Sequence, residues 1–169
     1  KKPKKLELID ELFLEKLNNL IKSCTEAFEN YEYARAKLET EKFFWGMFCD
    51  NYLEIVKKRV YENKKGKDSA QYILYYSLLI ILKLIAPIMP FIAEHIYTKV
   101  GGEKESVHLD SWPIFSKPDQ DILIEMKQVR QIVSLALEIR AQKGIKVRQP
   151  LAKLKLKTKN EKLKPELVD

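Results

Sequence analysis

Apolar residues recur every three or four positions along most of this 169-residue chain, and that interval is typical of helices with one apolar face. The pattern predicts helices over residues 8–28, 33–61 and 69–86, a short one ending near residue 100, and one over 119–143. The third is apolar nearly all round, as a helix at the centre of a bundle should be. Pro87 and Pro90 interrupt the pattern, and glycines follow several helix ends. We therefore expect an all-α fold, a bundle of about five helices.

The second predicted helix carries many aromatic residues. One set lies on a common face at helical spacing, and we interpret it as core. These residues are Ala34, Leu38, Trp45, Phe48, Tyr52 and Ile55. Phe43 and Phe44 point elsewhere on this helix, which ends in a basic turn. Because unpaired RNA bases stack on aromatic rings beside Lys and Arg, Phe43 is kept as a candidate RNA contact.

After Gly144 the apolar period changes from helical to alternating. Residues 145–148 and 154–157 alternate apolar and basic side chains, which predicts two short β-strands. Two such strands are not stable alone, so they either pack on the bundle or belong to a structure cut off by the end of the chain. The predicted domains are a helical bundle over residues 1–143 and a basic β-like extension over 144–169.

Composition narrows the class of protein. The hydrophobic fraction of 46% is ample for a core, and the longest uncharged stretch, residues 70–82, is shorter than the roughly 18 residues that a membrane span needs. The N-terminus is rich in Lys and lacks the compact apolar region of a signal peptide. Cys24 and Cys49 form no CxxC pair, so neither a disulfide framework nor a zinc site is indicated. We expect a cytoplasmic protein with no membrane partner.

Positive charge is concentrated in three segments. Residues 1–5, 57–67 and 141–169 together carry +15, while the rest of the chain carries −8, for a net charge of +7. Such segregation favours a one-sided electrostatic footprint for a nucleic acid, although lysines at loops and chain ends can also serve only solubility. The best candidates for RNA contacts are Lys57, Lys58, Arg59, Lys64, Lys65, Lys143, Lys146 and Arg148. Weaker candidates are Arg35, Lys42 and Phe43.

The sequence shows no constellation of catalytic residues. It contains no Gly-rich phosphate loop, no HExxH and no Gly-flanked serine. His95 and His108 are the two histidines, and neither has a second ligand at metal spacing. We expect no catalytic residue, no metal site and no cofactor in this chain.

Three segments resemble a known family. FWGMFCDNYLEIVK over residues 44–57, LKLIAPIMPFIAEHIY over 82–97 and SVHLDSWP over 106–113 are similar to signatures of the anticodon-binding domain of class I aminoacyl-tRNA synthetases. The first of them resembles valyl-tRNA synthetases most. GIKVRQPL over residues 144–151 is more similar to isoleucyl enzymes, which remain the alternative. The resemblance covers residues 10 to 150 in the family's order.

The resemblance implies a domain that positions the anticodon stem-loop of a tRNA, with valine tRNA as the expected partner. It also implies that the family's ATP-binding catalytic domain, with its HIGH and KMSKS elements, and its editing domain are absent from this chain. The chain alone should therefore not aminoacylate tRNA, and ATP and the catalytic domain belong to the parent enzyme. A rival from another class is a helical scaffold that docks on a protein. If the tRNA reading holds, alanine at Lys57, Lys58 and Arg59 should weaken tRNA binding without unfolding the domain.

Overall fold

The computed structural model describes residues 3, 6–62, 65–116, 120–146, 149–151, 153 and 155, with residues 120–130 described by their backbone only. The chain divides into two compact units, residues 1–118 and 119–169. Each unit is described by itself. The predicted boundary between residues 143 and 144 stays a prediction from the sequence.

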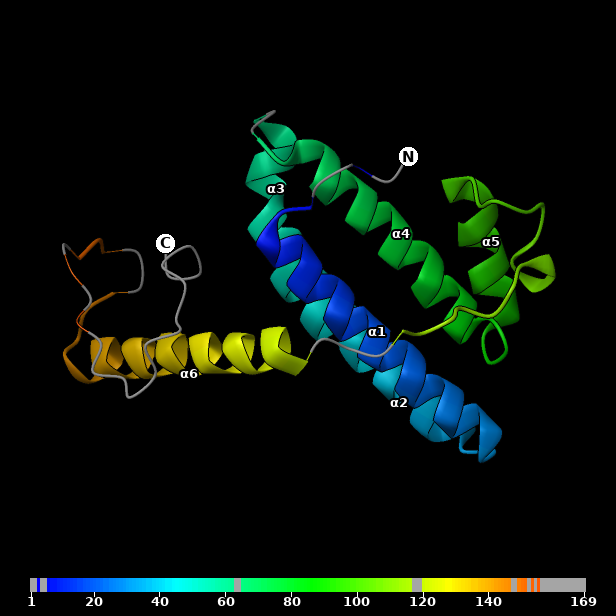
Figure 1. Ribbon diagram of the computed structural model, residues 1–169, viewed down its shortest axis with the longest axis horizontal. Coiled ribbons are helices and arrows are strands. Elements are labelled where there is room, and N and C mark those ends of the chain that lie inside the picture. The colour runs from blue at the N-terminus through cyan, green and yellow to red at the C-terminus, as the bar shows by residue number, and fades with distance from the viewer. Residues whose placement is uncertain are drawn as a thin grey trace. The chain divides into compact units, whose positions relative to one another are not determined.

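The first unit is a helical bundle, as predicted (Figure 1). Its elements are α1 (Leu8–Glu29), α2 (Tyr33–Lys42), the π-helix η1 (Phe43–Leu53), α3 (Glu54–Tyr61), α4 (Lys67–Ile85), α5 (Pro90–Val100) and the 3₁₀ turn η2 (Val107–Leu109). Helix α1, the continuous α2–η1–α3 helix and α4 lie side by side, and α5 packs on α4. The second unit contains α6 (Gln120–Gln142). These bounds confirm the predicted helices to within a few residues.

Helix α4 is the centre of the bundle, since α1, α2, α3, α5 and η2 all pack against it. Its nearly uniform apolar surface explains why: Ile73 and Leu84 are completely buried, and Ile80, Ile81 and Leu82 nearly so. By length and composition, α4 alone among the helices of the described chain could cross a membrane. More than half of its most apolar window is buried inside the protein, which is the property of a core helix.

The buried face of the second helix differs from the predicted one. Leu38, Trp45 and Ile55 are 50%, 63% and 48% exposed, and Ala34 is also exposed. Phe48 and Tyr52 are buried as predicted, and the other buried residues of this helix are Ala36, Thr40, Phe43 and Val56. The reason is η1, because a π-helix bonds residue i to i+5 and so brings Phe43 and Phe48, which are five positions apart, to the same side of the helix. The prediction extended one α-helical spacing over residues 33–61, so it assigned the wrong face to the residues before the π-helix.

Helix α2 lies against α1 through small side chains. The Cys24 sulfur is 3.4 Å from the Thr40 hydroxyl and 3.8 Å from the carbonyl oxygen of Ala36. Thr40 in turn donates to the Ala36 carbonyl at 2.8 Å. Burial raises the pKa of the Cys24 thiol. These small residues let the two helices approach closely, and Leu38 is left outside.

The segment after α5 is fastened back onto the bundle by polar contacts. Glu94 accepts hydrogen bonds from the Ser106 hydroxyl and the Val107 amide, at 3.0 and 2.9 Å. Asp110 lies 2.8 Å from the Lys83 ammonium and accepts from the Tyr97 hydroxyl at 2.6 Å. Burial acts to raise the pKa of Asp110, but the hydrogen bonds from Lys83 and Tyr97 outweigh it and hold that pKa below its usual value.

The same segment then runs along α1. The Trp112 indole donates to the Thr25 hydroxyl at 2.9 Å, and its ring meets Phe28 edge-on at 5.2 Å between centroids. Further along, Asn18 exchanges two hydrogen bonds with the Ser116 backbone, at 2.6 and 2.9 Å. The HLDSWP stretch is therefore a strap that joins α5 to α1.

The predicted β element is not shown. Its described residues, 145, 146, 149–151, 153 and 155, form no strand, and the rest of it lies outside the described residues. At the first predicted strand, the Gln149 amide donates to the Lys146 carbonyl at 3.0 Å, a bond between residues three apart that is typical of a turn. The Arg140 side chain donates to the Lys146 and Gln149 carbonyls. Backbone oxygens that a β-ladder would use are thus already bonded within the turn.

Two glycines predict opposite effects of the same substitution. Gly66 has φ of +81°, and a Cβ there would lie 2.8 Å from Glu7 Cγ and 3.1 Å from Arg59 Nη1. Gly46 lies in η1 with nothing within 4 Å of its Cβ position. We expect Gly66→Ala to lower the free energy of unfolding by about 1–2 kcal/mol and Gly46→Ala to raise it by up to about 1 kcal/mol. Denaturant titration of both variants checks this; a loss of stability in Gly46→Ala as large as in Gly66→Ala would contradict the account.

Candidate nucleic-acid interface

A buried polar cluster joins four parts of the bundle. The Asp10 side chain of α1, which is completely buried, accepts a hydrogen bond from the Tyr52 hydroxyl of η1 at 2.7 Å. It also accepts from Arg59 Nη2 of α3 at 2.5 Å and from the Ser69 hydroxyl of α4. Ser69 further accepts from the Glu7 amide at 3.3 Å. One carboxylate therefore holds α1, η1, α3 and α4 in register.

The surroundings of Tyr52 in this cluster determine the pH range over which its phenol stays protonated. Burial raises the pKa of the Tyr52 phenol, and the hydrogen bond to Asp10 raises it further. Tyr52 thus keeps its proton in the folded state above the pH at which an unfolded tyrosine loses it, near 10. Its stabilising contribution is present below that pH and is lost as the pH rises beyond it. Near neutral pH the cluster is intact.

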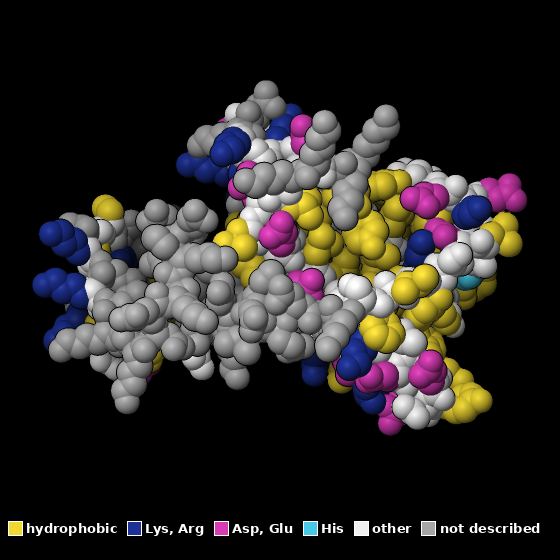
Figure 2. Space-filling view, viewed as in Figure 1, with side chains coloured by type: hydrophobic (Ala, Val, Ile, Leu, Met, Phe, Trp, Pro, Cys, Tyr) yellow, Lys and Arg dark blue, Asp and Glu magenta, His cyan; other side chains and the backbone are white. Residues whose placement is uncertain are grey.

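The cluster supports an exposed group of lysines, which we call the basic corner: Lys57 and Lys58 at the end of α3 and Lys65 in the turn before α4. All three side chains are exposed. Figure 2 shows Lys and Arg side chains gathered at the end of the bundle where α3 ends. Positive side chains at this place also complement the negative end of the α3 dipole. Lys57 forms an ion pair with Glu54 at the surface. Such an exposed pair contributes little free energy, so Lys57 can leave Glu54 and bind a phosphate at little cost.

Arg59 lies next to the basic corner but has a different role. Its side chain is 18% exposed and is bound to the buried Asp10. The sequence placed Arg59 among the best candidates for RNA contacts and expected its replacement by alanine, together with Lys57 and Lys58, to leave the domain folded. That expectation overlooked the ion pair, since loss of Arg59 leaves a buried carboxylate without its cation. Lys64 lies outside the described residues.

The three weaker candidates lie apart from the corner. Arg35 on α2 bridges Glu32 and Glu39 and is 40% exposed. Lys42 is exposed at the end of α2. Phe43 is 7% exposed, with its ring centroid 5.4 Å from that of Phe13. Its ring packs in the core at the start of the π-helix, and Phe43 lines a groove together with Lys42.

A second group of candidates lies in the other compact unit. Lys143 and Lys146 are exposed in the turn that follows α6. Arg148 lies outside the described residues. The candidates predicted from charge alone thus form two described groups, one in each unit.

The sequence interpretation missed two exposed aromatic residues. Tyr61 is 85% exposed and closes α3 directly after the basic corner. Trp45, which was assigned to the core, is 63% exposed. A free ring beside exposed lysines is suited to stacking on an unpaired base, so Tyr61 joins the candidates. The sequence KKRVY over residues 57–61 places Tyr61 shortly after three basic residues, and this could have marked it as a candidate for base stacking.

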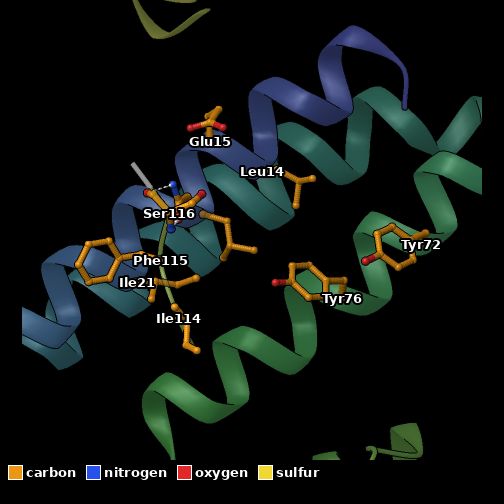
Figure 3. A pocket seen from close by; sticks show the side chains of 10 residues that line it. Leu14, Glu15, Ile21, Tyr72, Tyr76, Ile114, Phe115 and Ser116 are labelled. Carbon is orange, nitrogen blue, oxygen red and sulfur yellow. Dashed lines mark hydrogen bonds between the residues drawn. The ribbon is translucent and has the colours of Figure 1, made fainter. Parts of the chain in front are cut away.

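Several grooves lie on the described surface of the first unit, and one of about 390 Å³ has Lys42 and Phe43 among its lining residues. A groove of about 410 Å³ lies between α1 and α4, where Tyr72 and Tyr76 face Leu14 and Ile21, and Phe115 and Ser116, which follow the strap, lie along its edge (Figure 3). The two tyrosine rings are parallel, with centroids 5.8 Å apart. A third groove, of about 310 Å³, lies between α2–η1, α4 and α5 and is mostly apolar, with Trp45, Met89 and Ile92 on its rim.

The chemistry of the described surface is that of binding. Within the described part of the chain, no three His, Cys, Asp or Glu side chains gather as metal ligands. His108 is exposed in η2, and His95 is exposed on α5. The basic corner, held by a buried cluster and followed by a free tyrosine ring, offers ammonium groups to phosphates and a surface for stacking.

A helical bundle that exposes a group of lysines at one corner has the surface charge expected of a nucleic-acid-binding helical domain. The model of the anticodon-binding domain of tRNA ligases matches residues 10–156, and the chain belongs to this family. This confirms the resemblance drawn from the sequence.

Relatives give a finer comparison. The chain is 36% identical to a valine–tRNA ligase of Rickettsia felis over 154 residues. This match covers 87% of the chain and 18% of the relative. It is 37% identical over 155 residues to that of Rickettsia canadensis, covering 87% of the chain and 19% of the relative. The valine–tRNA ligase of Clostridium perfringens is 37% identical over 139 residues, or 78% of the chain and 16% of the relative. The chain thus spans less than a fifth of the length of these relatives.

Proposed function

We propose that this chain is the anticodon stem-loop binding module of a valyl-tRNA synthetase. The observation that carries the proposal is the similarity to valine–tRNA ligases over 87% of the chain, within a family of anticodon-binding domains. The basic corner supplies the physical means. Its lysines contact phosphates of the stem, which sets the position of the RNA, while Tyr61 stacks on a base of the loop.

The buried cluster gives this surface its rigidity. Asp10 connects α1 to η1, α3 and α4, so Lys57 and Lys58 are carried by a helix fixed at several points. Binding then costs less conformational entropy than it would on a mobile loop. The lysines contribute most of the affinity and make it salt-dependent, because each phosphate contact releases counterions.

The rest of the reaction is assigned to the parent enzyme. ATP-dependent aminoacylation takes place on a catalytic domain outside this chain, and the module positions the tRNA for it in the cytoplasm. No catalytic residue and no cofactor of the reaction is proposed within residues 1–169. The catalytic domain of the same synthetase is the proposed protein partner.

Binding of valine tRNA and isoleucine tRNA transcripts, each at about 50 and 200 mM salt, tests the proposal. We expect tighter binding of valine tRNA and a loss of affinity of roughly tenfold or more across this salt range. Tighter binding of isoleucine tRNA would support the isoleucyl alternative that residues 144–151 suggest. Binding that is weak and equal for all tRNAs would reject the module as an anticodon reader.

A protein-docking scaffold remains the second candidate function, and the apolar groove beside α5 is the observation that favours it. Trp45, Met89 and Ile92 are each at least 40% exposed on its rim. An apolar groove of this kind suits a hydrophobic segment of a protein better than a phosphate backbone. Under this alternative, removing the lysines of the basic corner leaves binding of the partner unchanged.

A further inference from the structure

We infer that Arg140 is a positioning residue that shapes the turn after α6 and presents Lys143 and Lys146 to the RNA. This inference rests on the proposed function and adds a second contact surface to it. The basic corner lies in the first compact unit, whereas Arg140 and these two lysines lie in the second.

The backbone of the turn closes α6 in a defined way. Gly144 has φ of +66°, the left-handed conformation that glycine adopts without strain. Its amide donates to the Ala141 carbonyl at 3.0 Å, and the Ile145 amide donates to the Arg140 carbonyl at 2.9 Å. These two bonds form a Schellman motif, which reverses the chain at the helix end. Lys143 and Lys146 lie on either side of this reversal.

The Arg140 side chain completes the turn from outside. Its Nη2 donates to the Lys146 carbonyl at 2.6 Å and to the Gln149 carbonyl at 2.5 Å. The Gln149 amide also donates to the Lys146 carbonyl, at 3.0 Å. Both the backbone and the side chain of Arg140 therefore bond the turn. The Arg140 carbonyl accepts from the Ile145 amide, and the guanidinium donates to the Lys146 and Gln149 carbonyls.

This arrangement keeps the lysine side chains on the surface, where a ligand can reach them. The guanidinium bonds backbone oxygens, and the Lys143 and Lys146 side chains remain exposed. Without these bonds, alternative conformations of the backbone would spread the Lys143 and Lys146 ammonium groups over a wide area. Because Arg140 holds the backbone, their spacing is set before RNA binds, and the entropy cost of binding is reduced.

A lysine in place of Arg140 separates positioning from simple attraction. Lysine keeps the positive charge, but its ammonium is a point charge on a flexible stem and does not reproduce the fixed planar geometry in which Nη2 of the guanidinium bonds both carbonyls. If Arg140 acts by holding the turn, Arg140→Lys should lose most of the affinity for tRNA that Arg140 provides. If Arg140 instead contacts a phosphate as a positive charge, Arg140→Lys should keep most of that affinity.

The test measures binding of valine tRNA by the full chain and four variants at several salt concentrations. The variants are Arg140→Ala, Arg140→Lys, Lys143→Ala/Lys146→Ala and the triple alanine variant. We expect Arg140→Ala and Arg140→Lys each to weaken binding by about three- to tenfold and to reduce the salt slope, with thermal unfolding of the chain unchanged. In the background lacking both lysines, Arg140→Ala should have less than about a twofold effect.

Three outcomes would overturn the inference. They are wild-type affinity in Arg140→Ala, wild-type affinity in Arg140→Lys, and an equal loss on Arg140→Ala with and without the two lysines. Absence of salt-sensitive binding by the unaltered chain would instead reject the proposed function, and the role of Arg140 with it. The unaltered chain thus tells the two failures apart.

Discussion

Asp10→Asn will lower the free energy of unfolding by about 3 kcal/mol, the largest stability effect expected for a polar substitution in this bundle. The asparagine keeps the size of the side chain but removes the charge that faces Arg59. The Asp10 carboxylate accepts hydrogen bonds from Tyr52, Arg59 and Ser69. Asparagine has an NH₂ group in place of one of the two acceptor oxygens, and this group cannot accept a hydrogen bond. A buried donor is then left without its acceptor. Urea titration followed by circular dichroism measures the change.

Asp50→Asn is the matched control for this prediction. Asp50 is exposed on η1, so the same chemical change should alter the free energy of unfolding by no more than about 0.5 kcal/mol. Equal effects of the two substitutions would show that the cluster does not hold the helices together. A comparable loss is expected for Arg59→Ala, because this change leaves the completely buried Asp10 carboxylate without its cation.

Replacing Lys57, Lys58 and Lys65 together with alanine should weaken binding of valine tRNA by about ten- to thirtyfold at low salt. The three side chains are exposed, so the free energy of unfolding should change little. The salt slope should fall by roughly two, because about three phosphate contacts are lost. This variant omits Arg59, since its removal would confound binding with stability. Fluorescence anisotropy at several salt concentrations provides both quantities.

The control variant carries alanine at Lys22, Lys37 and Lys99, three other lysines of the first unit. Lys22 and Lys37 pair with glutamates one helical turn away, and Lys99 is exposed on α5. The net charge of the two variants is the same. If both weaken binding equally, affinity follows total charge, and the basic corner has no special place in it.

The helical architecture was predictable because its signals are local. Apolar spacing gave the helices, Pro90 indeed begins α5, and Gly101 lies at its end with φ of +77°. The central place of α4 also followed from its sequence, since an apolar surface all round must be buried on every side. The family followed from motifs that lie within these same helices.

What the sequence could not give depends on changes of phase and on long-range pairing. The π-helix exchanged the environments of Phe43 and Trp45, burying the first and exposing the second. The Asp10–Arg59 pair joins residues 49 positions apart, and nothing near Arg59 in the sequence indicates a buried carboxylate. Alternation after Gly144 predicted strands, whereas the Arg140 side chain holds the described part as a turn.

Competition between two fragments of valine tRNA tests the central claim most directly. One fragment is the anticodon stem-loop, and the other is the acceptor arm closed as a hairpin of similar length and charge. The account predicts that the stem-loop displaces labelled valine tRNA from this chain at concentrations about tenfold or more below those needed by the acceptor hairpin. Equal displacement by both fragments, or better displacement by the acceptor hairpin, would contradict an anticodon-binding role.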